Sequence, residues 1–201
     1  MLKSYIAFDI ETTGLSPEEN EIIEIGALKV RDGKVQERFM EFIKPRLPIP
    51  ANITGITGIT NDMVEDARGR EQVIPDFLQF CGQDILIGHN VLFDYSFVKR
   101  SAESLGYTFE RDGIDTLKIA RTVHRDLPPK VWENCVSITG SIMRRPTELI
   151  MTRWLLPNCI RRWHIILKRR NRRSFSRALW SAPQRNARLP RKSSWIFSCV
   201  W

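Results

Sequence analysis

The sequence has no long hydrophobic run and no recognisable leader segment. No stretch approaches the roughly 18 apolar residues that a membrane span requires, and residues 1–7 lead directly into a strand pattern without a cleavage site. The four cysteines have neither a paired nor a metal-binding spacing, which is typical of free thiols in a reducing compartment. These absences predict a cytoplasmic protein that has no membrane partner.

Aspartate is missing from the sequence after residue 130. Residues 1–130 hold 16 Lys and Arg against 21 Asp and Glu, whereas residues 131–201 hold 15 Lys and Arg against two Glu. All six tryptophans also lie in residues 131–201. The net charge of +8 is therefore the sum of an acidic N-terminal part and a strongly basic, Trp-rich C-terminal part, and this asymmetry needs its own explanation.

The first third of the chain predicts three consecutive strands, at residues 4–10, 22–30 and 35–43. The dipeptide Asp32-Gly33 is a hairpin-turn signal between the second and third of them, and Pro45 ends the third. Short turns between consecutive strands are typical of an antiparallel meander.

The next segment, residues 48–60, has the composition of an irregular stretch, after which Asn61 or Asp62 is expected to cap a short helix. Apolar periodicity then predicts a helix over 71–81, a buried strand over 84–88, and helices over 94–105 and 116–124. This order predicts an α/β fold in which parallel strands follow the meander and helices flank a mixed sheet. Residues 131–201 show no sustained period of 3.6 or 2.

Asp9 and Glu11 are two positions apart on the first predicted strand, so both side chains leave the same face. Two carboxylates this close repel, which raises a pKa, and a divalent cation relieves the conflict. Hard oxygen ligands suit Mg²⁺ or Mn²⁺, and two such ions can hold the attacking and leaving oxygens of a phosphodiester. The alternative is a solvated strand end with incidental acids, since structural ion pairs also shift pKa values.

Two motifs resemble those of the DEDDh 3′–5′ exonucleases, including the proofreading type of DNA polymerase III. The segment 8–14, FDIETTG, resembles the first motif, and 88–94, GHNVLFD, resembles the second and places a third acid, Asp94, at the start of a helix. Taken alone, Asp94 would be interpreted as a plain N-cap. Residues 53–57 and 115–116 look like further landmarks, so the resemblance extends over about residues 3–130.

The resemblance implies a ribonuclease-H-like fold with two Mg²⁺ or Mn²⁺ ions, in which Asp9, Glu11 and Asp94 are metal ligands and catalytic residues. With the help of the ions, water would attack the last phosphodiester of a single-stranded or frayed DNA 3′ end. A replicative DNA polymerase is the expected partner. The residues implied to hold the terminal nucleotide or to support the second motif are Thr12, Thr13, Gly14, Leu15, Asn90 and Phe93.

The third motif that the resemblance requires is missing. It consists of a histidine, the general base, followed five positions later by an aspartate, the fourth metal ligand, both on a late helix that follows the second motif. After Lys130 the only histidine is His164, and position 169 is an arginine, while His124 and Asp126 have the wrong spacing. The site is therefore incomplete in this chain, and its activity is in question.

One lost base just before residue 131 would explain the missing motif. In the displaced frame a glycine codon spans residues 132/133, a histidine codon can span 146/147, and an aspartate codon can span 151/152, five positions after the histidine. We therefore interpret residues 1–130 as an incomplete exonuclease domain, and 131–201 as an out-of-frame, poorly ordered tail that replaces the last helices. The alternative is a genuine basic extension that grips nucleic-acid phosphates through Arg and Trp.

Three functions are consistent with these patterns. The leading one is a metal-dependent 3′–5′ exonuclease that acts on DNA. The alternatives are a non-catalytic nucleic-acid-binding protein, in which the acidic site is vestigial and the tail binds, and a polymerase-associated subunit. The same motifs serve RNA-trimming enzymes, so RNA stays open as a substrate.

Overall fold

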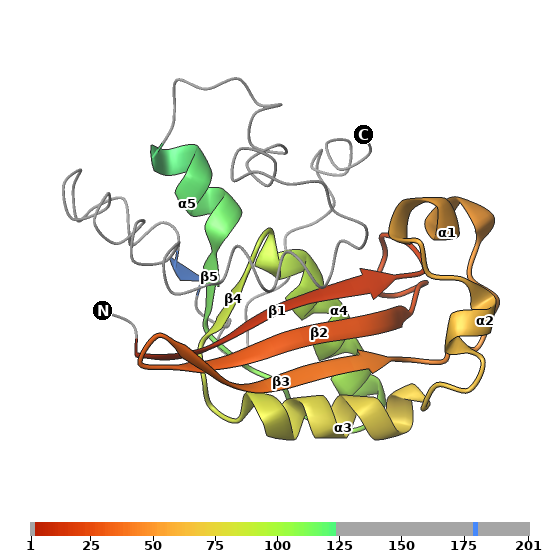
Figure 1. Ribbon diagram of the computed structural model, residues 1–201, viewed down its shortest axis with the longest axis horizontal. Coiled ribbons are helices and arrows are strands. Elements are labelled where there is room, and N and C mark those ends of the chain that lie inside the picture. The colour runs from red at the N-terminus through yellow and green to blue at the C-terminus, as the bar shows by residue number, and fades with distance from the viewer. Residues whose placement is uncertain (1–2, 124–178, 181–201) are drawn as a thin grey trace.

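A mixed six-stranded sheet forms the centre of the computed structural model, which describes residues 3–123 and 179–180 (Figure 1). The strand order is β3-β2-β1-β4-β5-β6. Strands β1 to β3 form an antiparallel meander, β4 and β5 run parallel to β1, and β6 is antiparallel to β5. The strands are β1 (Ser4–Thr12), β2 (Ile22–Arg31), β3 (Lys34–Phe42), β4 (Leu86–Gly88), β5 (Gly113–Asp115) and β6 (Leu179–Trp180).

Helices flank this sheet, as the sequence predicts. Helix α3 packs against β2 and β3, while α4 contacts β1, β4 and β5 and passes behind the meander in Figure 1. The expected α/β fold with a meander followed by parallel strands is confirmed. The helices are α1 (Ala51–Thr57), α2 (Asn61–Val64), α3 (Arg70–Cys81), α4 (Val91–Ser104) and α5 (Thr116–Val123).

The expectation of an irregular segment over 48–60 is wrong, because α1 lies within it. Helix α1 is only seven residues long, contains Gly55 and has no buried residue, so its sequence is too short to show an extended apolar face by which a helix is detected. Its N-cap is Pro50, and it ends at Gly58, whose positive φ of 74° lets its N–H reach the carbonyl of Thr54.

The cap expected for the next helix is also misplaced, since Thr60 is the N-cap of α2. The side chain of Asn61 binds elsewhere: its Oδ1 accepts a hydrogen bond of 2.7 Å from the N–H of Ile49. A tertiary contact with the preceding loop therefore takes the side chain that a local cap would have used.

Two boundaries shift near the second motif. The strand expected over 84–88 is shorter, because Asp84 leaves the sheet to bind Arg31 at 2.6 Å and Ser4 at 2.7 Å. The helix expected from 94 begins at Val91, since Asn90 adopts a left-handed backbone conformation with φ of 60° and serves as the N-cap. Asp94 therefore lies within the first turn of α4 and is not its cap.

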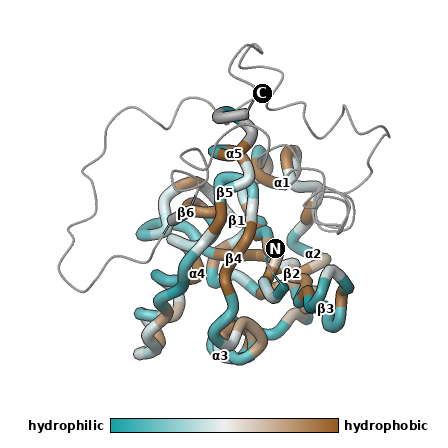
Figure 2. Tube along the Cα trace, turned by 90° about the vertical axis from the view of Figure 1, so that its left-hand side faces the viewer, coloured by the Kyte–Doolittle hydropathy of each residue, from teal (hydrophilic) through white to brown (hydrophobic). Residues whose placement is uncertain are grey.

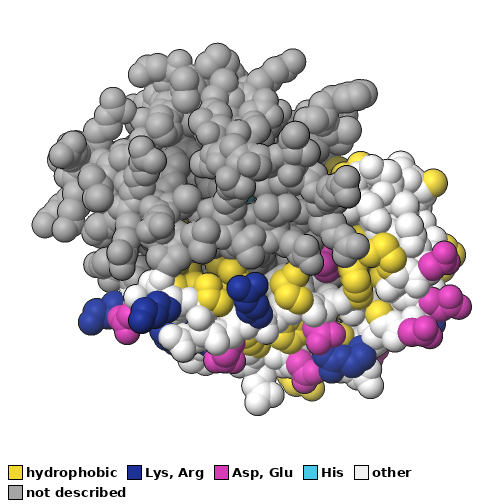
Figure 3. Space-filling view, in the orientation of Figure 1, with side chains coloured by type: hydrophobic (Ala, Val, Ile, Leu, Met, Phe, Trp, Pro, Cys, Tyr) yellow, Lys and Arg dark blue, Asp and Glu magenta, His cyan; other side chains and the backbone are white. Residues whose placement is uncertain are grey.

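The core lies between the sheet and helices α3 and α4. Phe77 of α3 is fully buried, and its ring centroid lies 5.8 Å from that of Phe8 and 5.4 Å from that of Phe39. The central strands β1 and β4 are hydrophobic along much of their length in Figure 2. On the face shown in Figure 3, hydrophobic side chains are interspersed with acidic and basic ones.

The hairpin expected at Asp32-Gly33 is confirmed, with positive φ at both residues joining β2 to β3. Among the described residues, no helix is long and apolar enough to cross a membrane. The expectations for the tail, 131–201, and for its lack of order lie outside the described residues, apart from the pairing of 179–180 with β5.

Candidate active site

Asp9 and Glu11 lie near the carboxyl end of β1. They alternate with the buried residues Phe8, Ile10 and Thr12, so the two carboxylates share one face of the strand and the apolar side chains Phe8 and Ile10 anchor it from the other. The strand pattern of the sequence thus places both acids as expected, on a rigid element in the middle of the sheet.

Asp94 reaches the same place from α4. Strand β4 pairs with β1 only at Ile6 and Ala7, so it ends before Ile10. The N–H of Ile10 donates to Asp94 Oδ1 at 3.1 Å, so this carboxylate accepts the hydrogen bond that a neighbouring strand would otherwise have accepted. With 3% of its surface exposed, Asp94 is a buried acid that ties the start of α4 to β1 between the two other carboxylates.

The pKa of each of the three carboxyls lies above its ordinary value. Burial, followed by the charge of Glu24, raises the pKa of Asp9 to about 7, although a hydrogen bond with Asp94 partly opposes this. Burial, with the charges of Asp9 and Glu24, raises the pKa of Glu11 to about 8. Burial and the charge of Asp9 likewise raise the pKa of Asp94. Such shifts are typical of functional sites.

The donor set fits a divalent cation by its chemistry. As the side chains stand, no three His, Cys, Asp or Glu residues in the described part of the chain are grouped to hold a metal ion. Asp9 instead bonds to Asp94. No Lys or Arg of the described residues is among the causes that shift the pKa values of these three carboxyls. Carboxylates are the hard oxygen donors that Mg²⁺ and Mn²⁺ prefer, and a cation would replace the protons they hold.

The loop after β1 is held by its own polar groups. Thr12 Oγ1 donates to the carbonyl of Gly14 at 2.6 Å, and Thr13 exchanges backbone and side-chain hydrogen bonds with Glu21. A Cβ at position 14 would lie 2.3 Å from Asn20 Oδ1, which explains the glycine. Of the four residues expected to hold a nucleotide, only Leu15 is exposed, at 53%, and the hydrogen bonds of Thr12 and Thr13 shape the loop.

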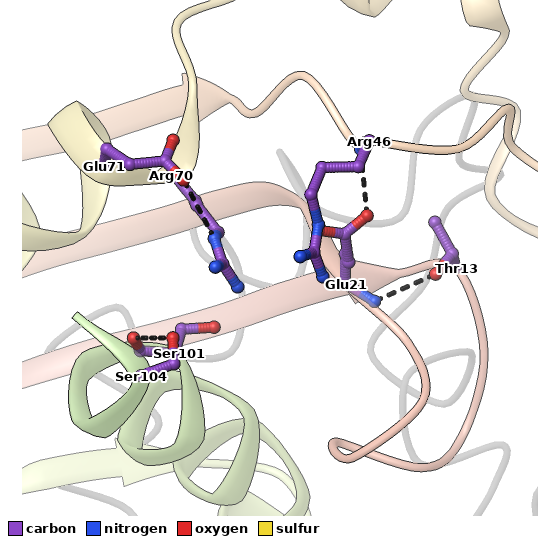
Figure 4. A network of polar contacts seen from close by, with 7 residues as sticks. All are labelled: Thr13, Glu21, Arg46, Arg70, Glu71, Ser101 and Ser104. Atoms are coloured by element: carbon purple, nitrogen blue, oxygen red, sulfur yellow. Dashed lines mark hydrogen bonds and ion pairs between the residues drawn. The ribbon is translucent and has the colours of Figure 1, made fainter.

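Figure 4 shows that the loop after β1 is held by contacts of Glu21 with Thr13 and Arg46. Both carboxylate oxygens of Glu21 accept bonds from Arg46, at 2.9 Å from its backbone N and at 2.7 Å from Nε. A cavity of about 210 Å³ lies beside this pair and is also lined by Arg70, Arg100 and Ser101. None of the residues expected at the site lines it, whereas Asn20 and Glu21 of the loop do.

Asp115 holds the backbone of the second motif in place. In the sequence it was identified only as part of the family landmark at 115–116. The buried carboxylate of Asp115 accepts hydrogen bonds from the N–H of Asn90 at 3.1 Å and of Leu117 at 2.9 Å. It therefore joins the start of α5 to the turn before α4. Phe93 supports the same helix from within, its ring centroid 5.0 Å from that of Phe97.

Glu24 is the residue of this site that sequence reasoning missed. It lies on β2 directly opposite Glu11, and its charge acts on both Asp9 and Glu11. The signal that could have found it is the register of the first hairpin, because an antiparallel pairing places opposed residues on one face.

Solved structures share this fold. Exonuclease X in complex with 5′ overhanging duplex DNA is similar with a TM-score of 0.55 at 25% identity, covering 81% of this chain and 89% of that one. The zinc-bound complex of Escherichia coli exonuclease I with single-stranded DNA has a TM-score of 0.65 at 15% identity, covering 88% of this chain and 43% of that one.

Curated relatives are much longer than this chain. The PolC-type DNA polymerase III of Caldanaerobacter subterraneus subsp. tengcongensis is 46% identical over 123 residues, which are 61% of this chain and 9% of that protein. The PolC-type enzyme of Clostridium perfringens is 41% identical over 133 residues, 66% of this chain and 9% of its own. The chain spans about a tenth of their length. The model of the exonuclease family matches residues 6–140, and the chain belongs to this family.

Proposed function

We propose that this chain is a 3′–5′ exonuclease domain that removes nucleotides from DNA 3′ ends, in the manner of a polymerase III proofreading exonuclease. The observation that carries the proposal is the meeting of Asp9, Glu11 and Asp94 at the end of β4, in a fold shared with DNA-bound exonucleases. We take a single-stranded or frayed 3′ end as the substrate, and the single-stranded DNA in the exonuclease I complex supports this choice.

The carboxyls would hold two Mg²⁺ or Mn²⁺ ions. When bound, such ions lower the pKa of a water and neutralise the charge that develops on the phosphate. Asp9 and Glu11 supply oxygens from a rigid strand, and Asp94 supplies one from the first turn of α4. Their raised pKa values mean that they give up protons as the ions enter, so binding strengthens as pH rises.

The substrate contacts follow from the loop after β1. Leu15 is exposed there and offers an apolar surface to the terminal base, while Thr12, Thr13 and Gly14 keep the loop in shape. Asn90 and Phe93 act through α4, by fixing the helix that carries Asp94.

The missing third motif limits activity in this chain. After the second motif, no histidine is followed five positions later by an aspartate, so we propose slow hydrolysis by an incomplete site. The interpretation of residues 131–201 as an out-of-frame tail stands as part of this proposal, and the nucleotide sequence of the gene tests it. Stop codons in the displaced frame would overturn it.

A nuclease assay with Mg²⁺ or Mn²⁺ on a 5′-labelled single strand tests the proposal. We expect slow, stepwise release of nucleotides that Asp9→Ala abolishes and that Asp62→Ala, at an exposed position of α2, leaves unchanged. An RNA strand of the same sequence distinguishes the two substrates. If all three proteins leave the strand intact but shift it in a gel, the chain is a non-catalytic nucleic-acid-binding protein.

A partnership with a replicative polymerase is supported by the PolC-type relatives. Co-purification of the full chain with a PolC-type polymerase checks it, and elution of the two as separate species would count against it.

A further inference from the structure

A cavity of about 210 Å³ lies on the side of the sheet that α3 and α4 cover. Its lining residues come from the loop between β1 and β2, the segment after β3, the first half of α3 and the later turns of α4. Asp9 and Glu11 leave the other face of the sheet, since they alternate along β1 with Phe8, which packs on Phe77 of α3. The cavity is therefore separate from the candidate active site.

Basic side chains outnumber acidic ones in the lining of this cavity. The basic residues are Lys44, Arg46, Arg70 and Arg100, and the acidic residues are Glu18, Glu19 and Glu21. Two of the acids have partners of their own, since Glu21 binds Arg46 at 2.7 Å and Glu18 accepts a hydrogen bond of 2.8 Å from Ser16. The lining therefore keeps an excess of positive charge.

Two of the arginines use only part of their hydrogen-bonding capacity. Arg46 binds Glu21 through its backbone N and its Nε, and Arg70 binds Glu71 through its Nε at 3.1 Å. Within the part of the chain that the structure describes, the terminal nitrogens of these two guanidinium groups donate no hydrogen bond. Figure 4 shows both groups directed toward the space between them, with Ser101 of α4 beside it.

The third arginine, Arg100, is exposed and forms no hydrogen bond or ion pair with any other described residue. Three like charges that line one cavity repel each other, and an anion relieves this repulsion. A guanidinium group matches the oxygens of a phosphate, to which it can donate two parallel hydrogen bonds. One phosphate group fits a cavity of about 210 Å³, since a water molecule takes up about 30 Å³ in the liquid.

We propose that this cavity binds the dianionic phosphate group that inorganic phosphate and nucleoside monophosphates share. The terminal nitrogens of Arg46 and Arg70 and the hydroxyl of Ser101 hold the phosphate oxygens, and Arg100 adds positive charge at the exposed side. The inference does not depend on the proposed exonuclease activity, because none of the proposed metal ligands lines the cavity.

Isothermal titration calorimetry of the full chain in EDTA at pH 8 tests the site, with inorganic phosphate and deoxyadenosine monophosphate as ligands. EDTA removes divalent cations, so neither ligand can bind through ions at the candidate active site. Arg70→Gln should weaken the binding of both ligands at least about tenfold, since charge-assisted hydrogen bonds are the strong ones. Arg38→Gln, at an exposed arginine of β3 that does not line the cavity, is the matched control and should change the affinity less than about twofold.

A second variant decides the test if Arg70→Gln does not fold, which its melting temperature without phosphate shows. Ser101→Ala removes one hydroxyl group and should weaken the binding of both ligands about threefold. Phosphate should also raise the melting temperature of the unsubstituted chain, and should raise that of each cavity variant less. Normal binding by Ser101→Ala together with an unfolded Arg70→Gln protein would overturn the inference.

The two ligands distinguish the sources of the phosphate group. A higher affinity for deoxyadenosine monophosphate would identify nucleotides as the ligand, and an equal or lower one would identify inorganic phosphate; either result supports the site. The absence of saturable binding would overturn it. Equal effects of Arg70→Gln and Arg38→Gln would also overturn it, because the binding would then follow the overall charge of the chain and not the cavity.

Discussion

At the scale of single residues, Asp9 and Glu11 combine burial with mutual repulsion. Neither is favourable for a metal-free fold, and both push their pKa values toward neutrality. Among the described residues, the charge that acts on both of them is that of another acid, Glu24. We expect such a site to be stabilised by protons at low pH and, under the proposed function, by divalent cations at higher pH.

This crowding predicts how stability depends on pH without metal. The ordinary pKa values of 3.8 and 4.5 apply to Asp9 and Glu11 in the unfolded chain, against about 7 and about 8 in the folded one. Between these limits the folded state binds more protons, so its stability falls as pH rises from about 4 to about 8. Thermal unfolding in EDTA at pH 5 to 8 measures the effect.

The control is the double variant Asp9→Asn and Glu11→Gln, which cannot titrate at these positions. Its melting temperature should fall less over the same pH range, and millimolar Mn²⁺ should flatten the curve of the unsubstituted chain. Parallel curves for the two proteins would show that these carboxyls keep their ordinary pKa values.

At the scale of elements, the carboxylate of Asp115 connects the turn between β4 and α4 to the start of α5. Asp115 caps α5 through Leu117 and also holds the N–H of Asn90, the residue with left-handed backbone before α4. His89 adds a contact of 3.3 Å between its Nδ1 and Thr116 Oγ1. The start of α4, and with it Asp94, is therefore positioned by the next strand along the sheet.

Asp115→Ala should cost about 3 kcal/mol of unfolding free energy, because it leaves buried N–H groups without acceptors. It should also weaken Mn²⁺ binding, since α4 loses its anchor, whereas Asp62→Ala should do neither. Urea unfolding and Mn²⁺ titration check both effects. Full metal affinity in a destabilised Asp115→Ala protein would mean that Asp115 does not position Asp94.

Helix α3 is held to the sheet by aromatic packing. Phe77 is fully buried between Phe8, Phe39 and Phe80, so Phe77→Ala should cost about 3 to 5 kcal/mol. Leu47→Ala, at a residue that is 74% exposed, should stay within about 0.5 kcal/mol. Equal effects of the two substitutions in urea unfolding would contradict this account of the core.

At the scale of the whole molecule, the family match ends at residue 140, and the described part of the chain contains two of the three motifs that the resemblance requires. A catalytic unit that lacks its base and one ligand loses activity out of proportion to the number of residues lost. The cytoplasmic location and the polymerase partner stay predictions at this scale.

Restoring the reading frame before residue 131 should therefore raise the rate of 3′ hydrolysis by at least about a thousandfold. The comparison is between the present chain, the restored chain, and the restored chain with Asp9→Ala, assayed on one labelled strand. A restored chain as slow as the present one would show that residues 131–201 are not a displaced third motif.

Much of the architecture was predictable from the sequence because it depends on residues that are close together in the chain. The alternation around Asp9 and Glu11, the Asp32-Gly33 turn and the apolar periods of α3 and α4 each depend on neighbours in the chain. Helix α1 was missed because its seven residues, with Gly55 among them, are too few to show an extended apolar period.

The sequence by itself determined the family, the strand that carries two acids, and the helix that carries the third. Only the tertiary structure decided that Asp94 takes the place of a strand partner for Ile10, that Thr12 and Thr13 shape their own loop, and that Glu24 joins the acids. The reason is physical. Residue type and local period select an element, whereas the partner of a given N–H or carboxylate depends on where neighbouring strands end and in which register they pair.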